Sequence, residues 1–107
     1  MGCLPVAADR GWRVEFLAEA EADIAEGVGW YDRQRLGLGR ELAVLVRDAA
    51  TIITAAPHRW PLKGSTRRYI LARFPYTIAY RVLDEKRLVV IEAVAHQKRD
   101  PATWSNR

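Results

Sequence analysis

His96, Arg73 and Arg81 are the side chains best suited to chemistry in this 107-residue chain. An unperturbed imidazole titrates near pH ~6.5, so His96 can serve as a general acid or base close to neutrality. An arginine guanidinium is always charged and grips phosphate oxygens through paired hydrogen bonds. The three residues together predict a site that moves a proton beside a phosphate. The alternative is structural, with His96 bonded to a neighbouring strand or the tail and the arginines forming a solvated strand face.

Other basic and aromatic side chains fit contact with a polyanion or a protein partner. Arginine supplies 14 of the 17 basic residues, and its planar fork suits phosphate better than lysine does. We expect Lys63, Arg68 and Arg99 to bind nucleic acid, and Trp104 to anchor a partner or a target. A single cysteine, Cys3, excludes an internal disulfide and a multi-cysteine metal site. We therefore expect neither a metal nor a cofactor.

The hydropathy pattern predicts the elements that must position these side chains. Residues 12–16 alternate between apolar and charged, which is typical of a half-buried strand. Residues 17–56 show apolar side chains every three or four positions, interrupted at Gly37-Leu38-Gly39 and ended by Pro57, so they predict two helices joined by a tight turn. Residues 58–65 follow Pro57 and contain Pro61 and Gly64, so they predict an irregular connector. Residues 67–73, 76–83 and 88–96 predict three strands joined by short turns.

This order of elements defines the fold class as α+β: a strand, a helical hairpin, then a three-stranded antiparallel meander, packed as two layers with one face of the sheet open. The two-residue period of the last strand assigns Val89, Ile91, Ala93 and Ala95 to the helix-facing side. Glu92 and His96 then belong to the open face, as does Arg81 of the preceding strand.

Composition places the chain in the class of soluble, single-domain globular proteins. Half of the residues are hydrophobic and 28% are charged, and no apolar run approaches the ~20 residues that span a bilayer. We therefore expect one domain over residues 1–107, with less ordered tails at 1–11 and 100–107, no membrane contact and a cytoplasmic location. The net charge of +4 is unevenly spread: residues 1–48 hold nine acids and six bases, net −3, and residues 49–107 hold four acids and eleven bases, net +7.

Several strings in this order resemble the RelE/ParE superfamily of toxins from bacterial type II toxin-antitoxin modules. The resemblance runs from Phe16 to about Arg99. It rests on Trp30-Tyr31, Gly37-Leu38-Gly39, Pro57 with Pro61, Arg73-Phe74-Pro75-Tyr76 followed by Ile78 and Tyr80, and the segment from Ala93 to Pro101 with Trp104. The closing segment is similar to that of members described as plasmid-stabilisation proteins.

The resemblance implies one of two activities. RelE-like members cleave messenger RNA in the ribosome without a metal, and for this activity His96, Arg73 and Arg81 would be the catalytic residues. ParE-like members inhibit DNA gyrase without catalysis. In both groups a partly disordered antitoxin wraps the toxin, so we expect a hetero-oligomer with an antitoxin that presents an acidic, amphipathic C-terminal segment.

Two departures from the nuclease pattern keep both activities open. The lysine run of the second helix in the best-known messenger RNA cleaving members is absent, since Arg40 and Arg47 are the basic residues there. The C-terminal tyrosine of those enzymes has no match in residues 97–107. Ribosome-dependent cleavage of messenger RNA, gyrase inhibition and a non-toxic antitoxin-binding remnant are the hypotheses that the sequence leaves.

Overall fold

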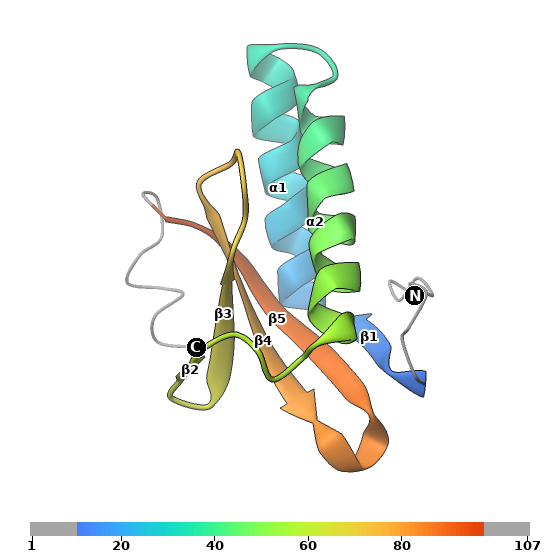
Figure 1. The fold of residues 1–107 in the computed structure, drawn as a ribbon. Coiled ribbons are helices and arrows are strands. Elements are labelled where there is room, and N and C mark those ends of the chain that lie inside the picture. Colours follow the sequence, from blue (N-terminus) through green and yellow to red (C-terminus); the bar gives the residue numbers. More distant parts are fainter. Residues whose placement is uncertain (1–10, 98–107) are drawn as a thin grey trace.

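A computed structural model describes residues 11–97 of the chain. In chain order its elements are β1 (Arg13–Phe16), α1 (Ala18–Gln34), α2 (Leu38–Ala55), β2 (Leu62–Lys63), β3 (Thr66–Ile70), β4 (Tyr76–Leu83), a 3-10 turn (Asp84–Lys86) and β5 (Leu88–His96). Figure 1 shows the two helices side by side against a twisted sheet. The predicted α+β class, with a strand, a helical hairpin and an antiparallel meander, is confirmed.

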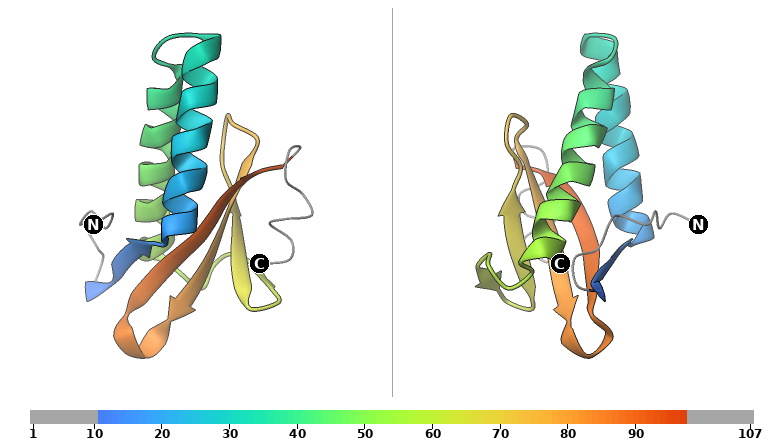
Figure 2. Two further views of the ribbon diagram at one scale, coloured as in Figure 1. Left: turned by 180° about the vertical axis from the view of Figure 1, so that it is seen from behind. Right: turned by 45° about the vertical axis from the view of Figure 1, so that its right-hand side comes forward.

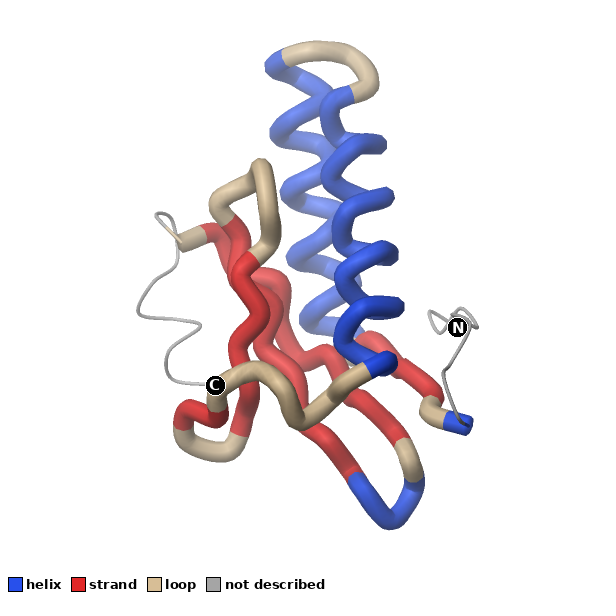
Figure 3. The backbone as a smooth tube through the Cα atoms, viewed as in Figure 1, coloured by secondary structure: helices blue, strands red, loops and turns tan. Residues whose placement is uncertain are grey.

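The sheet has five strands in the order β1-β5-β4-β3-β2. β1 lies parallel to β5, with Val14 opposite Val89, because the helical hairpin carries the chain back across the sheet before the meander begins. The other pairs are antiparallel. Both helices lie on the same face of the sheet, which makes the two predicted layers (Figures 2 and 3).

The connector contains a strand that the sequence analysis did not predict. Leu62 and Lys63 form β2 and pair with Arg67 and Thr66. Gly64 allows the tight reversal between them, since its φ of 65° lies in the left-handed region. Pro57 and Pro61 both precede this strand without entering it, so they do not prevent the pairing. The strand predicted over residues 67–73 ends earlier than expected, because β3 ends at Ile70 and residues 71–75 form the turn into β4.

Two glycines shape the helical hairpin: Gly37 allows the turn, and Gly39 allows the helices to approach closely. Gly37 has a φ of 92° and begins α2 directly after α1 ends. Gly39 packs against α1 so closely that an added Cβ would lie 2.3 Å from the Val28 carbonyl oxygen. The Gly39 N–H donates to Asp32 Oδ1 at 2.8 Å, which satisfies a donor at the start of α2. The close approach of the helices therefore depends on the absence of a side chain at position 39.

The core lies between the helices and the sheet. Helix α2 contributes Leu42, Val46, Ala49, Ala50 and Ile53, and β4 contributes Tyr76, Ile78 and Tyr80. The Tyr80 hydroxyl donates to the Pro57 carbonyl at 2.9 Å, so its polar end is satisfied within the core. Tyr76 and Tyr80 are the two largest of the fully buried side chains among the described residues.

The alternation predicted for the last strand is wrong beyond Ile91. Tyr80 pairs with Ile91 whereas Ala79 pairs with Ala93, so Glu92 is an extra residue in β5 and forms a β-bulge. The extra residue reverses which side chains face the helices. Val94 joins the core beside Ile78, whereas Ala93 is not part of that core cluster.

Candidate functional site

His96 lies on the helix-facing side of the sheet and not on the open face. It is the β5 partner of the buried Tyr76, and directly opposed residues of an antiparallel pair project to the same side. Their rings meet edge to face, with centroids 5.1 Å apart. The expected exposure of His96 on the open face is therefore wrong, and the bulge at Glu92 is the physical reason.

The two arginines expected beside His96 are separated from each other and engaged in ion pairs. Arg73 lies in the β3–β4 turn at a φ of 74° and binds Glu41 of α2 at 3.1 Å. Arg81 projects to the open face, as predicted, and its Nε donates to Glu92. Arg81 is five positions along β4 from Tyr76, which is roughly 16 Å at the usual rise per residue. Arg81 and His96 consequently lie on opposite faces of the sheet and near opposite ends of β4.

Lys63 and Arg68 do come together, in a groove of about 500 Å³ beside β2 and β3. We call this the open-face groove; it is lined by Pro61, Leu62, Lys63, Arg68, Ile70, Thr77 and Gln97. Two of its apolar side chains stand out into solvent, since Leu62 is 60% and Ile70 is 70% exposed. The groove thus combines apolar walls with two cationic groups, which suits a partner that is both acidic and apolar.

Arg68 is the more embedded of these two cations. Its Nη1 donates to Thr66 Oγ1, and burial lowers the pKa of its guanidinium while the charge of Glu92 raises it. At the far wall of the groove, Gln97 Nε2 donates to Thr77 Oγ1 at 3.1 Å. Arg68 is therefore held in place by its own strand, whereas Lys63 on the short edge strand is exposed.

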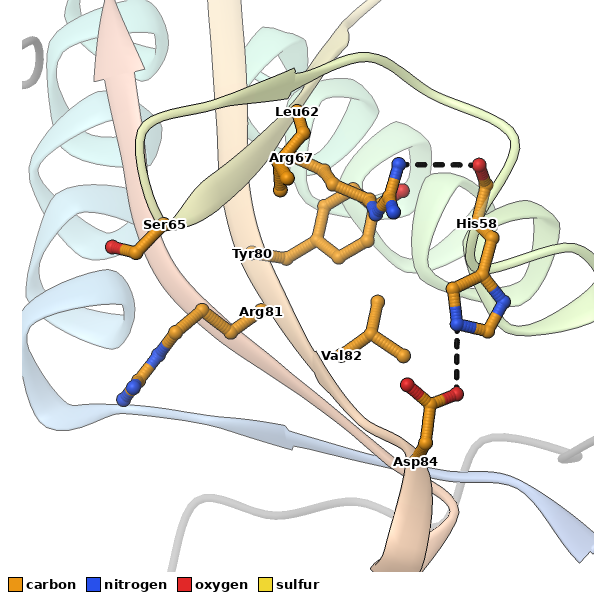
Figure 4. Close-up of a pocket in the computed structure, with 8 residues that line it drawn as sticks. All are labelled: His58, Leu62, Ser65, Arg67, Tyr80, Arg81, Val82 and Asp84. Atoms are coloured by element: carbon orange, nitrogen blue, oxygen red, sulfur yellow. Dashed lines mark hydrogen bonds and ion pairs between the residues drawn. The ribbon is translucent and has the colours of Figure 1, made fainter.

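A second hollow, of about 230 Å³, lies where the connector meets the free end of β4 (Figure 4). Arg67 Nη1 donates to the carbonyl oxygens of Trp60 at 2.7 Å and His58 at 3.2 Å. His58 Nε2 lies 2.7 Å from Asp84 Oδ1. Figure 4 shows Arg81 pointing away from this pair. The polar groups of this pocket hydrogen-bond the connector to the sheet. We therefore interpret the pocket as part of the structural contact between the connector and the sheet.

Burial raises the pKa of Tyr80 to about 12, and the nearby charge of Arg67 opposes this shift. The phenol therefore stays protonated and keeps its hydrogen bond to Pro57 at neutral pH. No nucleophile in this pocket is hydrogen-bonded to a base among the eight residues that line it. The pocket supports the fold around the site and does not assemble a catalytic pair.

Four acidic residues make contacts that the sequence analysis did not predict. Asp23 of α1 accepts a hydrogen bond at 3.0 Å from the Val94 N–H, at the part of β5 that β1 does not cover. Glu41 lies 3.8 Å from Arg35 as well as 3.1 Å from Arg73. Glu92 and Asp84 hold Arg81 and His58. Apart from Arg35, their partners lie 11 to 71 residues away in sequence, beyond the reach of a local pattern.

The remaining predicted site residues, Arg99 and Trp104, lie outside the described residues, as do the tails apart from Gly11. Within residues 11–97, no group of three or more histidine, cysteine or acidic side chains could hold a metal ion. None of the described helices is long and apolar enough to cross a membrane.

Solved structures of toxin-antitoxin complexes share this fold. A chain of the chromosomal ParDE system from P. aeruginosa is similar with a TM-score of 0.70 and 12% identity, over 82% of this chain and 98% of that one. The intact E. coli RelBE complex gives a TM-score of 0.63, 18% identity and coverage of 82% and 99%. The RelBE2 complex from Mycobacterium tuberculosis gives 0.57, 27% identity and coverage of 80% and 98%. No curated protein matches the chain.

The fold is thus that of the RelE/ParE toxin superfamily, which confirms the resemblance drawn from the sequence. A family model described as "ParE toxin of type II toxin-antitoxin system, parDE" matches residues 14–101, which is most of the chain. The chain belongs to this family of type II toxins.

Proposed function

We propose that this toxin inhibits DNA gyrase without catalysing a reaction of its own. The observation that carries the proposal is the separation of the expected catalytic residues. His96 packs on Tyr76 on one face, while Arg81 is paired with Glu92 on the other. Metal-free cleavage of RNA needs an acid, a base and a cation around one phosphate, and these three side chains do not surround one point. The match to the ParE family model agrees with this choice.

Cleavage of ribosome-bound messenger RNA is the second candidate, and one contact favours it. The Gln97 N–H donates to the Pro75 carbonyl at 2.8 Å, so the end of β5 that carries His96 lies beside the turn that carries Arg73. A nuclease built on these two residues would have to release Arg73 from Glu41 when it binds RNA. That release is the step that the gyrase proposal does not require.

One experiment separates the two activities. Purified toxin is added to gyrase and relaxed plasmid, and supercoiling is followed with increasing toxin; induced cells are assayed in parallel for messenger RNA cleavage at ribosomes. We expect loss of supercoiling and intact messenger RNA, and we expect the His96→Ala, Arg81→Ala double variant to behave like the wild type. Cleaved messenger RNA with normal supercoiling at stoichiometric excess of toxin would overturn the proposal.

We further propose that an antitoxin neutralises the toxin by laying an acidic, amphipathic C-terminal segment in the open-face groove. Leu62 and Ile70 offer exposed apolar contacts, and Lys63 and Arg68 offer the complementary charge. A disordered segment gains affinity by ordering against such a surface. Co-purification of the toxin with the product of the neighbouring small reading frame, as a hetero-oligomer from the cytoplasm, tests this assignment.

A further inference from the structure

The end of the helical hairpin carries an exposed apolar side chain with three exposed arginines close to it in sequence. Leu36, in the turn between α1 and α2, is 89% exposed, and Val44 on the outer side of α2 is 44% exposed. Arg33, Arg35 and Arg40 lie within four residues of Leu36 and are all exposed. We call these five residues the hairpin-tip patch. Figure 1 shows that this end of the hairpin projects beyond the sheet, where none of the strands within residues 11–97 covers it.

The backbone under the patch is rigid, so the exposure of Leu36 does not come from a loose loop. The Arg35 N–H donates to the Tyr31 carbonyl at 3.0 Å, and the Leu38 N–H donates to the Arg35 carbonyl at 3.0 Å. The two helices are in close contact next to this turn. Gly39 packs against Val28, and the Gly39 N–H donates to Asp32. A partner would therefore bind Leu36 without the cost of ordering a flexible segment.

The positive charge of the patch is only partly compensated. Asp32 is occupied by the Gly39 N–H, and Glu41 is shared between Arg35 and Arg73. Among residues 11–97, Arg33 and Arg40 have no carboxylate within ion-pair distance. The surface thus presents positive charge to any partner that approaches the tip, and its complement is an acidic surface.

An acidic protein fits this patch better than a nucleic acid does. A phosphate backbone would satisfy the arginines but would leave Leu36 and Val44 in water. A protein surface can supply carboxylates and an apolar recess together, and arginine is enriched in protein interfaces. Burying the apolar area of a leucine adds affinity that salt does not screen.

We infer that the hairpin-tip patch is the surface with which the toxin binds an acidic, apolar-lined site on gyrase. This inference rests on the proposed gyrase inhibition and adds the contact residues to it. It places the target surface at the helical end of the molecule, away from the open-face groove that we assign to the antitoxin. Target and antitoxin therefore occupy different faces, and the antitoxin would not act by direct competition at Leu36.

The test compares gyrase affinity and supercoiling inhibition for two separate variants of the full-length toxin, Leu36→Glu and Arg40→Glu. We expect each to weaken binding by at least about tenfold, as for a central interface residue. Leu36→Met, which keeps an apolar side chain, should bind as the wild type does. Arg13→Glu is the matched charge reversal, since Arg13 is exposed on β1 at the opposite end of the molecule (Figure 1). Melting temperature and antitoxin affinity should be unchanged in all four.

The possible outcomes test the patch assignment separately from the proposed inhibition of gyrase. Wild-type toxin that neither binds nor inhibits gyrase would refute the proposed function, and the patch assignment would fall with it. Inhibition by the wild type with equal inhibition by Leu36→Glu and Arg40→Glu would refute the patch alone. Selective loss of antitoxin binding, or of binding to duplex DNA or RNA, in these variants would also overturn it by assigning the patch to another partner.

Discussion

Tyr76 and His96 face each other across β4 and β5, with their ring planes at 83° and their centroids 5.1 Å apart. Tyr76 is among the most buried side chains of the core and packs on Tyr31 of α1 as well. The imidazole therefore covers the end of the aromatic core that joins the hairpin to the sheet. This position gives His96 a packing role at the end of the strand.

His96→Ala should leave growth arrest intact and lower the free energy of unfolding by about 1 kcal/mol, because an edge-to-face aromatic pair is worth about that much beyond its buried area. Urea unfolding measures the stability, and induced expression measures the toxicity. His96→Phe, which restores a ring, is the control and should recover most of the loss. Abolished toxicity with unchanged stability would support the nuclease and contradict the packing role.

Gly39→Ala should destabilise the hairpin strongly. The added Cβ would lie 2.3 Å from the Val28 carbonyl oxygen and 2.9 Å from Asp32 Oδ1, so the two helices would have to move apart. Forced overpacking of this kind costs about 1–3 kcal/mol. Thermal unfolding by circular dichroism measures the change.

Gly29→Ala is the matched control in the other helix. The nearest atom to its added Cβ is Arg33 Nη1 at 3.6 Å, an ordinary contact with the end of a flexible side chain. Alanine in a helix interior is favoured over glycine by about 0.5–1 kcal/mol, so this variant should be more stable than the wild type. Equal effects at the two positions would show that the close approach at Gly39 does not hold the hairpin together.

The sequence predicted the fold well where local patterns decide it. Helical spacing, the Gly37-Leu38-Gly39 turn and the strand runs are properties of neighbouring residues, and the observed elements agree with them. The site was predicted less well, because the bulge at Glu92 and the ion pairs of Arg73 and Arg81 depend on strand partners and on residues far away in sequence. A strict two-residue alternation does not account for the extra residue of a β-bulge. The alternation therefore predicted the wrong face for His96.

Tyr80→Phe should reduce stability at neutral pH by about 1–2 kcal/mol, because it leaves the buried Pro57 carbonyl without its donor. It should also change the alkaline limb of the stability curve. The pKa of Tyr80 is raised from 10.0 to about 12 on folding, so its stabilising contribution is present below pH 10 and is lost as pH rises through 12.

Urea unfolding at several pH values from 9 to 12 measures both effects. The wild type should lose stability over this interval more steeply than Tyr80→Phe. Tyr69→Phe removes a half-buried hydroxyl from the neighbouring strand and serves as the control. Parallel curves for the wild type and Tyr80→Phe would contradict the pKa raised by burial, and equal stability at neutral pH would contradict the assigned hydrogen bond.

Lys63→Glu should weaken antitoxin binding by about tenfold at low salt, since it reverses the exposed cation of the open-face groove opposite an acidic segment. The difference from the wild type should shrink as salt is raised, because exposed charges are screened within about 8 Å at physiological ionic strength. Titration of labelled antitoxin at low and high salt measures both. Lys86→Glu, in the exposed turn after β4 and outside the groove, is the matched reversal and should bind normally. Equal losses in both variants would indicate attraction by overall charge, and unchanged binding of Lys63→Glu would remove the groove as the antitoxin site.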